Sequence, residues 1–310
     1  MGGLLGELGK KLAERWLTLL VLPGVLLLAT LASALTLGHL HALDLARLTH
    51  EIDRWAASPR WTTTGRLAVV LTAILLASAV AGLAAQAAGS AIERVSLAAD
   101  WTQWPWGARQ LARHHTATRR ARWDRHAETY QMLLGQERAR ITVPSSEGSS
   151  GARTHSMEEA RTAMLRIAEE RPARPTWIGD RINATAIRLE RQFDVDLGLV
   201  WPHLWLMLPD TARTEVTAAR GRLTGATTLL GWGLLYAAIG TMWWPGLLVS
   251  TVVCVTGWRR SREAADAYSL LLEASSRLYM RELADQVGFD HIGLLNPQIG
   301  GDLSDHIKGP

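Results

Sequence analysis

Uncharged apolar residues gather in three long blocks of the chain, 16–38, 67–92 and 223–258. A helix needs about 20 apolar residues to cross the hydrocarbon core of a bilayer, so each of the first two blocks fits one crossing. The third block would measure about 54 Å as one helix at about 1.5 Å per residue, which is too long for a single crossing. Residues 242–246, Met-Trp-Trp-Pro-Gly, supply a break, because Pro removes a helix donor and paired Trp suit a membrane interface. The pattern therefore predicts an all-α protein with four transmembrane helices in two hairpins.

Two alternatives remain open for these blocks. Residues 223–258 could form a re-entrant hairpin that returns to its own side of the membrane without a full crossing. The first block also has the pattern of a secretory signal peptide, with a basic start, an apolar middle and a cleavage-like Ala32-Ser33-Ala34. Cleavage there would leave the topology of the remaining spans unchanged.

Basic residues indicate which side of the membrane is cytoplasmic. Arginines follow the second block, precede the third and follow its end, whereas residues 39–66 balance their arginines with Asp44, Glu51 and Asp53. Because basic residues near span ends mark the cytoplasmic side, we expect both termini to lie there. The sequence thus predicts a multi-pass protein of the plasma membrane.

The first hairpin is expected to occupy residues 1–92, with spans at 16–38 and 67–92. Between these spans, residues 39–58 carry apolar side chains at helical spacing, which predicts an amphipathic helix on the outer side. The residues on this apolar face are Leu45, Leu48, Ile52 and Trp55.

The remaining polar segments predict the cytoplasmic part of the protein. Residues 93–222 are too long for a loop and are expected to form a helical domain. The second hairpin, 223–258, follows, and residues 259–287 then predict one continuous cytoplasmic helix. Residues 288–310 are rich in Gly and Pro and predict a flexible tail.

Small residues recur at spacing four in the second block, a pattern that lets helix backbones approach closely in lipid. This face predicts a helix-packing surface, which either packs against the first block or forms a homo-oligomer interface. Its residues are Ser78, Ala81, Gly82, Ala85 and Gly89.

Tryptophan and arginine are concentrated just after the second block. Tryptophans beside a span are typical of an interfacial anchor, and each basic residue near an anionic membrane surface contributes about 1 kcal/mol. A face that is solvated, or paired inside the protein, is the alternative. No nucleic-acid recognition motif accompanies the charge, so nucleic acid is not an expected partner. The residues predicted to contact anionic lipid are Trp101, Trp104, Trp106, Arg109, Arg113, Arg119, Arg120 and Arg122.

Three runs carry a resemblance: residues 175–180 read PTWIGD, residues 191–197 read RQFDVDL, and residues 201–209 read WPHLWLMLP. Together they resemble a family of uncharacterised multi-pass membrane proteins from high-GC bacteria, over about residues 172–287. The resemblance implies the membrane hairpin and the helix that follows it. That family carries no established activity, so the resemblance implies no catalytic residues.

Sequence signatures of enzymes are missing from the chain. It has no GxxxxGK[ST] phosphate loop, no GxSxG nucleophile elbow, no GxGxxG and no HExxH. The one cysteine, Cys254, lies in an apolar block and is expected to pack there as a small apolar side chain. We therefore expect no catalytic residues, no cofactor and no metal site.

The apolar blocks contain no Asp, Glu, Lys, Arg or His, which argues against an ion-coupled carrier. Hydroxyl side chains could still line a pore, although hydroxyls in membrane helices usually bond their own helix backbone. These hydroxyl residues are Thr227, Thr228, Thr241, Ser250, Thr251 and Thr256.

These patterns favour a non-enzymatic, membrane-anchored interaction or scaffold protein that forms a homo-oligomer. Its expected partners are membrane lipids, anionic ones included, and other copies of itself. A small oligomeric ion channel is the first alternative and a lipid-active membrane enzyme the second. No small-molecule ligand can be named from the sequence.

Overall fold

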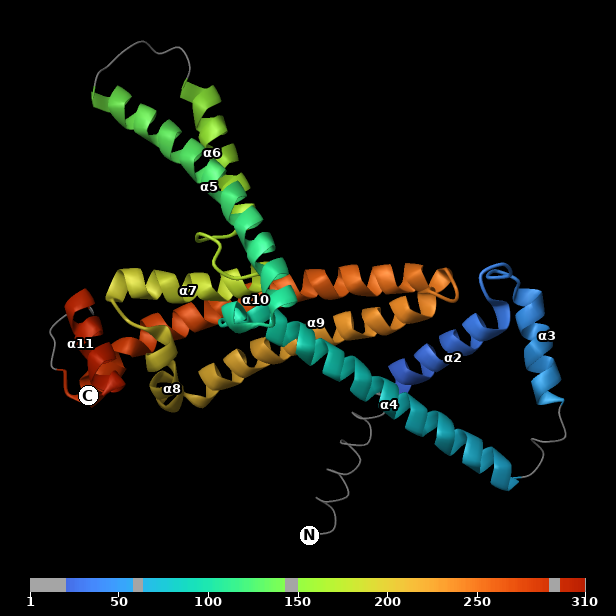
Figure 1. Cartoon of the computed structure of the whole chain (residues 1–310). Coiled ribbons are helices and arrows are strands. Elements are labelled where there is room, and N and C mark those ends of the chain that lie inside the picture. The colour runs from blue at the N-terminus through green and yellow to red at the C-terminus, as the bar shows by residue number, and fades with distance from the viewer. Residues whose placement is uncertain (1–20, 58–63, 143–149, 290–295, 310) are drawn as a thin grey trace, which may run out of the picture. The chain divides into compact units, whose positions relative to one another are not determined.

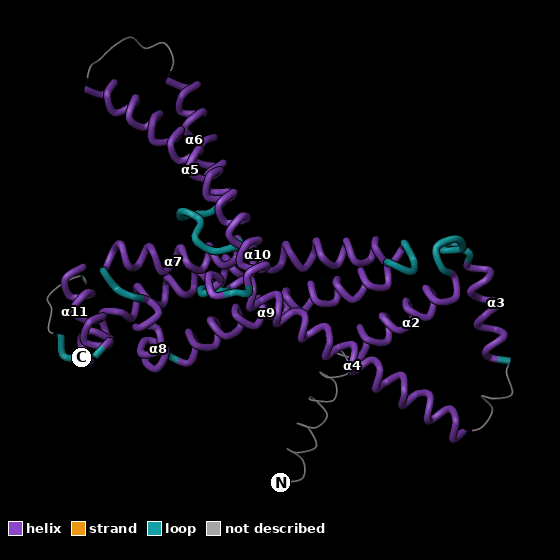
Figure 2. Tube along the Cα trace, viewed as in Figure 1, coloured by secondary structure: helices purple, strands orange, loops and turns teal. Residues whose placement is uncertain are grey.

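The computed structural model describes residues 21–57, 64–142, 150–289 and 296–309. Within these ranges the chain forms ten α-helices, one 3-10 helix and no strands, so the all-α prediction is confirmed (Figures 1 and 2). The helices are α2 (Leu22–Leu37), α3 (Leu45–Ala56), α4 (Thr64–Leu97), η3 (Trp101–Gln103), α5 (Trp106–Thr142), α6 (Ser150–Ile167), α7 (Trp177–Phe193), α8 (Leu197–Met207), α9 (Asp210–Gly240), α10 (Pro245–Val287) and α11 (Pro297–Lys308).

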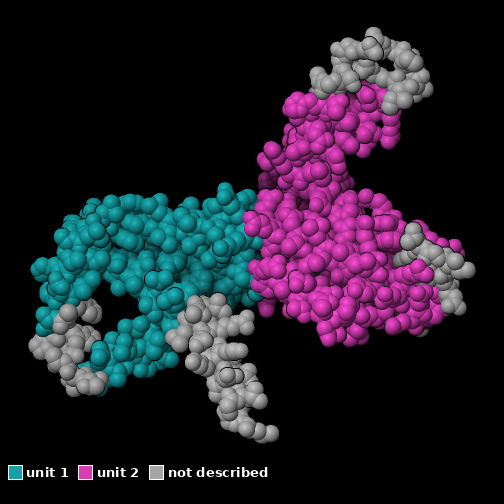
Figure 3. Space-filling view, turned by 180° about the vertical axis from the view of Figure 1, so that it is seen from behind, with its two compact units in different colours: residues 1–93, 224–260 teal, residues 94–223, 261–310 magenta. Residues whose placement is uncertain are grey.

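The chain divides into two compact units, each drawn in its own colour in Figure 3. Unit 1 comprises residues 1–93 and 224–260, and unit 2 comprises residues 94–223 and 261–310. The division follows the charge pattern, because unit 1 takes the apolar blocks and unit 2 takes most of the charged sequence.

Two helices in the described residues are long and apolar enough to cross a membrane, Gly65–Leu97 and Asp210–Gly240. The four such helices expected from the sequence are not found by this criterion. The described part of the first block, α2, has only 16 residues, because the block begins outside the described residues. The last block is the apolar start of α10, a 43-residue helix that runs on without a break into charged sequence.

Unit 1 is held together by a small apolar core and by hydrogen bonds that His39 and Trp243 make between two turns. The turn at 241–244, where the sequence predicts a break, joins α9 to α10. In it, Trp243 donates its indole N–H to the carbonyl oxygen of Ala42 at 3.0 Å. The amphipathic helix expected within residues 39–58 forms as α3, with Leu45 and Ile52 exposed. The buried core residues come from α2, α4 and α9 and are Leu27, Ala34, Ala85, Trp232 and Ile239.

Unit 2 contains two buried clusters and a pair of helices, α5 and α6, that lie side by side along their length (Figure 1). The smaller cluster joins α7, α9 and α10 through Ile178, Leu223, Ala264 and Ala265. The larger cluster joins α8, α10 and α11 and the segment before α8. Its buried residues are Val195, Val200, Leu204, Met280, Leu283, Ala284 and Leu303.

The C-terminal segment differs from the flexible tail predicted for residues 288–310. Residues 297–308 form α11, and Leu303 is completely buried in the larger cluster. The Asn296 side chain caps the helix by accepting the N–H of Ile299 at 2.9 Å, and Pro297 follows at the first helical position. The prediction relied on the Gly and Pro content of this segment and overlooked these helix start signals, which is why it was wrong.

Gly300 lets α11 approach the end of α7, because a Cβ at this position would overlap the carbonyl oxygen of Phe193. We expect Gly300→Ala to detach α11, since a helix near the chain end relieves such a clash by moving away. Overpacking of this kind costs about 1–3 kcal/mol. Hydrogen exchange should show lost amide protection in residues 297–308.

Gly301→Ala is the matched control for this change. Its Cβ would meet only the carboxylate of Asp194, a side chain that can rotate. Equal protection of α11 in the two variants would contradict the expectation.

Candidate functional site

The loop between α6 and α7 is held by side chains of η3 and α5. Its prolines, Pro172 and Pro175, interrupt helical hydrogen bonding, so the main-chain carbonyls of the loop need other donors. Five side chains supply them over distances of 2.8 to 3.2 Å. The pairs are Trp101 to Ala173, His115 to Pro175, Arg119 to Arg174 and to Ile167, Arg120 to Pro172, and Trp123 to Ala168.

A buried ion pair fixes the same loop to α7. Asp180, in the first turn of α7, accepts the backbone N–H groups of Ala173 and Arg174 at 2.8 and 2.7 Å through one oxygen. Its other oxygen lies 2.6 Å from the guanidinium of Arg119. The side chains are only 3% and 13% exposed, so this pair binds the protein to itself.

The residues predicted to contact lipid fall into two groups in the structure. Trp101, Arg119 and Arg120 bind the loop, which is the paired alternative that the sequence left open. The signal that sequence reasoning missed is the acid Asp180, placed just after a proline-rich loop. In the second group, Trp104 and Arg109 are half-buried and Trp106, Arg113 and Arg122 are exposed.

A ladder of ion pairs joins α7 to α10. Arg181 Nε lies 2.6 Å from Asp266, and Arg188 Nη2 lies 2.5 Å from Glu273, seven residues further on in both helices. Equal spacing in the same direction means that the two helices run parallel and in register here. Glu169, in the loop between α6 and α7, contacts both arginines and so joins the loop to the ladder.

Glu273 makes the ladder sensitive to acid. Burial opposes its charged form, but the hydrogen bond and charge of Arg188, with the charges of Arg277 and Arg181, outweigh burial and hold the pKa of Glu273 below its ordinary value of 4.5. A lowered carboxyl pKa stabilises the fold above the ordinary value, and this contribution is lost as pH falls through the folded-state pKa.

We therefore expect Glu273→Gln to lower the Tm at pH 7 and to flatten its further decline as the pH is taken through 4.5 and below. Thermal melts at a series of pH values would measure both effects. Glu282, exposed on the same helix, provides the control variant Glu282→Gln. If the melting temperature of Glu273→Gln followed the same slope against pH as that of the unmodified protein, the ladder would not carry this acid sensitivity.

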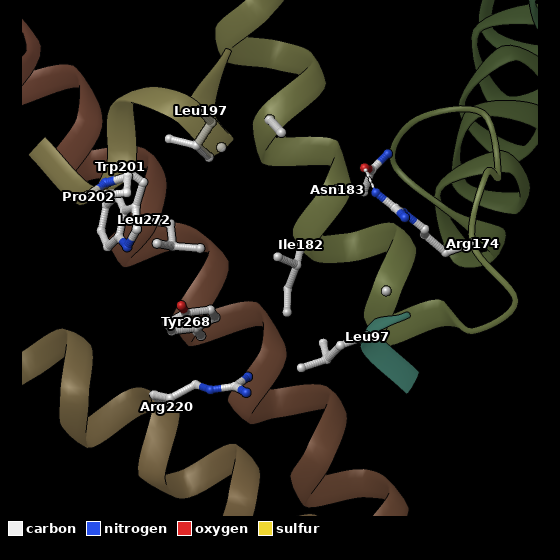
Figure 4. A pocket seen from close by; sticks show the side chains of 13 residues that line it. Leu97, Arg174, Ile182, Asn183, Leu197, Trp201, Pro202, Arg220, Tyr268 and Leu272 are labelled. Carbon is white, nitrogen blue, oxygen red and sulfur yellow. Dashed lines mark hydrogen bonds between the residues drawn. The ribbon is translucent and has the colours of Figure 1, made fainter. Parts of the chain in front are cut away.

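Two hollows open in unit 2 among α7, α8, α9 and α10, with volumes of about 510 and 590 Å³. Trp201, Pro202, Arg220 and Tyr268 line both of them. In the first hollow, Arg174 and Asn183 lie on one side and Trp201 and Tyr268 on the other (Figure 4). Such volumes fall within the usual range of small-molecule sites. Nothing in the sequence signalled these hollows, because their residues come from five separate helices and the loop before α7.

The small-residue face of α4 lies inside unit 1. Ser78 and Ala85 are completely buried, and Gly82 and Gly89 are buried as well. A Cβ at Gly89 would come within 2.6 Å of the Cα of Thr228 in α9. This face therefore meets helices of the same chain, with α9 as well as α2 as its neighbour.

The hydroxyl side chains considered for a pore are bonded within unit 1. Ser250 donates to the carbonyl oxygen of Gly233 on the neighbouring helix at 2.8 Å. The others donate to carbonyls three or four residues earlier in the chain at 2.7 to 3.0 Å, and Thr227 also lies 3.2 Å from the carboxylate of Glu93 on α4. These residues are Thr227, Thr228, Thr241, Thr251 and Thr256. These bonds add no support to the pore alternative.

Comparison with protein-family models, with curated proteins and with solved structures found no match to this chain. The resemblance over residues 172–287 therefore stays a prediction. In the described residues, no three His, Cys, Asp or Glu side chains come together as metal ligands would. The chemistry of the site thus rests on the two hollows and on the surfaces of unit 2.

Proposed function

We propose that this chain is a non-enzymatic, membrane-anchored interaction protein, with unit 1 as the anchor and unit 2 as the cytoplasmic binding part. The surface of α4 supports the anchor, because only 11% of its most apolar window is buried. A core helix of a soluble protein would be mostly covered. Its exposed large side chains are those that lipid would cover, among them Val69, Leu76 and Val80.

In the proposed topology both termini and unit 2 lie in the cytoplasm, as the basic residues beside the apolar blocks favour. α4 and α9 are long enough to cross the bilayer. The first block and the start of α10 complete two hairpins in this proposal, giving four crossings. The exposed apolar side chains of α3, Leu45 and Ile52, suit the outer membrane surface.

The observation that carries the interaction role is the arm, by which we mean α5 beyond Asp124 together with α6. Up to Asp124, α5 bonds the loop between α6 and α7, and Asp124 itself pairs with Arg171 at 2.8 Å. Beyond it, α5 continues for about 27 Å at about 1.5 Å per residue. This part packs along α6 (Figure 1) and adds nothing to the two buried clusters of unit 2. Ordering a helix pair that adds nothing to the core costs conformational entropy. The binding of a partner to this pair would offset that cost.

The arm also offers a route to a homo-oligomer. The small-residue face of α4 is used within the chain, so self-association needs another surface. The exposed Met132, 58% accessible on the arm, is an apolar contact point available to a second copy or to another protein.

Photo-crosslinking in intact membranes tests this function. A photoreactive residue at Met132 should give a discrete protein adduct, whose mass identifies a second copy or another partner. The same residue at Val80, exposed on α4, should give no protein adduct because lipid surrounds it. The proposal fails if Met132 captures no protein and native mass spectrometry finds a monomer.

A further inference from the structure

The two hollows of unit 2 combine apolar walls with positive charge. The first is lined by Leu97, Ile182, Leu197 and Leu272, and the second by Trp205, Leu206 and Val216, in addition to the four shared residues. Arg174 and Arg220 are the charged residues of the lining, and no Asp or Glu lines either hollow. A ligand that fits both features has an anionic group next to an apolar part.

Arg220 is the residue placed to hold the anionic group. Arg174, which donates to Asn183 at 3.0 Å, lies at one side of the first hollow and does not border the second. Arg220 borders both hollows, and its guanidinium carbon lies 5.8 Å from the ring centroid of Tyr268. Burial raises the pKa of Tyr268 above its ordinary value despite the charge of Arg220, so its hydroxyl stays neutral. A guanidinium suits the oxygens of a phosphate, to which it can donate two parallel hydrogen bonds.

The position of these residues in the sequence points to the source of the ligand. Arg220 comes three residues before Leu223, where the charge-free stretch of α9 begins. On α8, Leu206 is 77% exposed beside the half-buried Trp205, which is typical of a helix at a membrane interface. Both features favour a ligand that comes from the bilayer.

We propose that the two hollows, which share four lining residues, bind one anionic phospholipid, with its phosphate at Arg220 and its apolar part against Trp201, Trp205 and Val216. The site depends on the membrane location proposed above, but not on any contact made by the arm. It also differs from the lipid surface expected on α5, where Arg119 and Arg120 bind the protein itself.

Native mass spectrometry of the full chain released from nanodiscs tests the proposal. We expect Arg220→Gln to weaken retention of phosphatidylglycerol about tenfold, since it removes a charged hydrogen-bond donor. The matched control is Arg222→Gln, two residues away on the same helix, which removes the same charge from an exposed residue outside both hollows. Equal losses in the two variants would mean general electrostatic attraction and would overturn the site.

A second variant and a set of other ligands separate the remaining outcomes. Thr217→Trp fills the second hollow while leaving both arginines in place, and it should also reduce retention; unchanged retention would overturn the site. Phosphatidylcholine, oleate and inorganic phosphate should not displace phosphatidylglycerol, and displacement by any of them would overturn the choice of ligand. Melting temperatures confirm that each variant is folded. Loss of the lipid site with adducts still forming at Met132 would leave the interaction role intact.

Discussion

Replacing Asp180 with alanine is expected to lower the free energy of unfolding of unit 2 by about 3–5 kcal/mol, the usual cost of removing one partner of a buried ion pair. The change would leave the charge of Arg119, only 13% exposed, without its carboxylate. The N–H groups of Ala173 and Arg174 would lose their acceptor at the same time. Thermal and denaturant unfolding of the purified chain would measure the loss.

Asp124→Ala is the matched control, because it removes a carboxylate that pairs with an arginine of the same loop. That pair is well exposed, so water screens it and the change should have little effect. The double variant Arg119→Met with Asp180→Ala should recover part of the stability, since no unpaired charge is then buried. If Asp180→Ala and Asp124→Ala proved equally mild, the loop would not depend on the buried pair.

Gly231→Ala is expected to have the second largest effect, in unit 1. A Cβ on this residue of α9 would overlap the carbonyl oxygen of Ala85 and come within 2.9 Å of the backbone nitrogen of Gly89. Both contacts are with the main chain of α4, which cannot rotate away. The two helices must separate, at a cost of about 1–3 kcal/mol, and the Tm in detergent should fall.

Gly225→Ala, on the same helix, tests whether helix propensity alone explains any change. A Cβ there meets nothing within 4 Å, and alanine favours a helix by about 1 kcal/mol over glycine. We therefore expect this variant to be as stable as the unmodified chain or more so. A Gly231→Ala variant that melts at the same temperature as Gly225→Ala would refute the close approach of α4 and α9.

Most helices other than α11 could be predicted from the sequence, because hydrophobic period and breaks act over short distances. The direction in which a long side chain points could not be predicted in this way. The arginines of α5 form one dense charge cluster in the sequence, but Arg119 and Arg120 turn towards a loop about 50 residues away. Their acceptors are main-chain carbonyls, which leave no mark in the residue types.

The hollows and the second neighbour of α4 were beyond prediction for a related reason. The small-residue spacing of α4 indicates a close helix contact, for which the first block was one expected partner, but α9 enters the chain more than a hundred residues later. Likewise, Arg220 and Tyr268 become neighbours only when α9 and α10 fold back on each other. Contacts of this kind depend on tertiary structure.

Unit 2 is built from two separate stretches of the chain, 94–223 and 261–310, and this fixes when its core can fold during synthesis. Its larger cluster needs Val200 and Leu204 from before the α9–α10 turn and Met280 and Leu303 from after it. The ribosome must therefore make all of residues 224–260 before this core can close. Until then, the apolar side chains of α8 remain exposed, because the residues that bury them in the folded protein have not yet been made. Nascent chains halted just after residue 260 should accordingly be cut by protease within α8, whereas completed chains resist it.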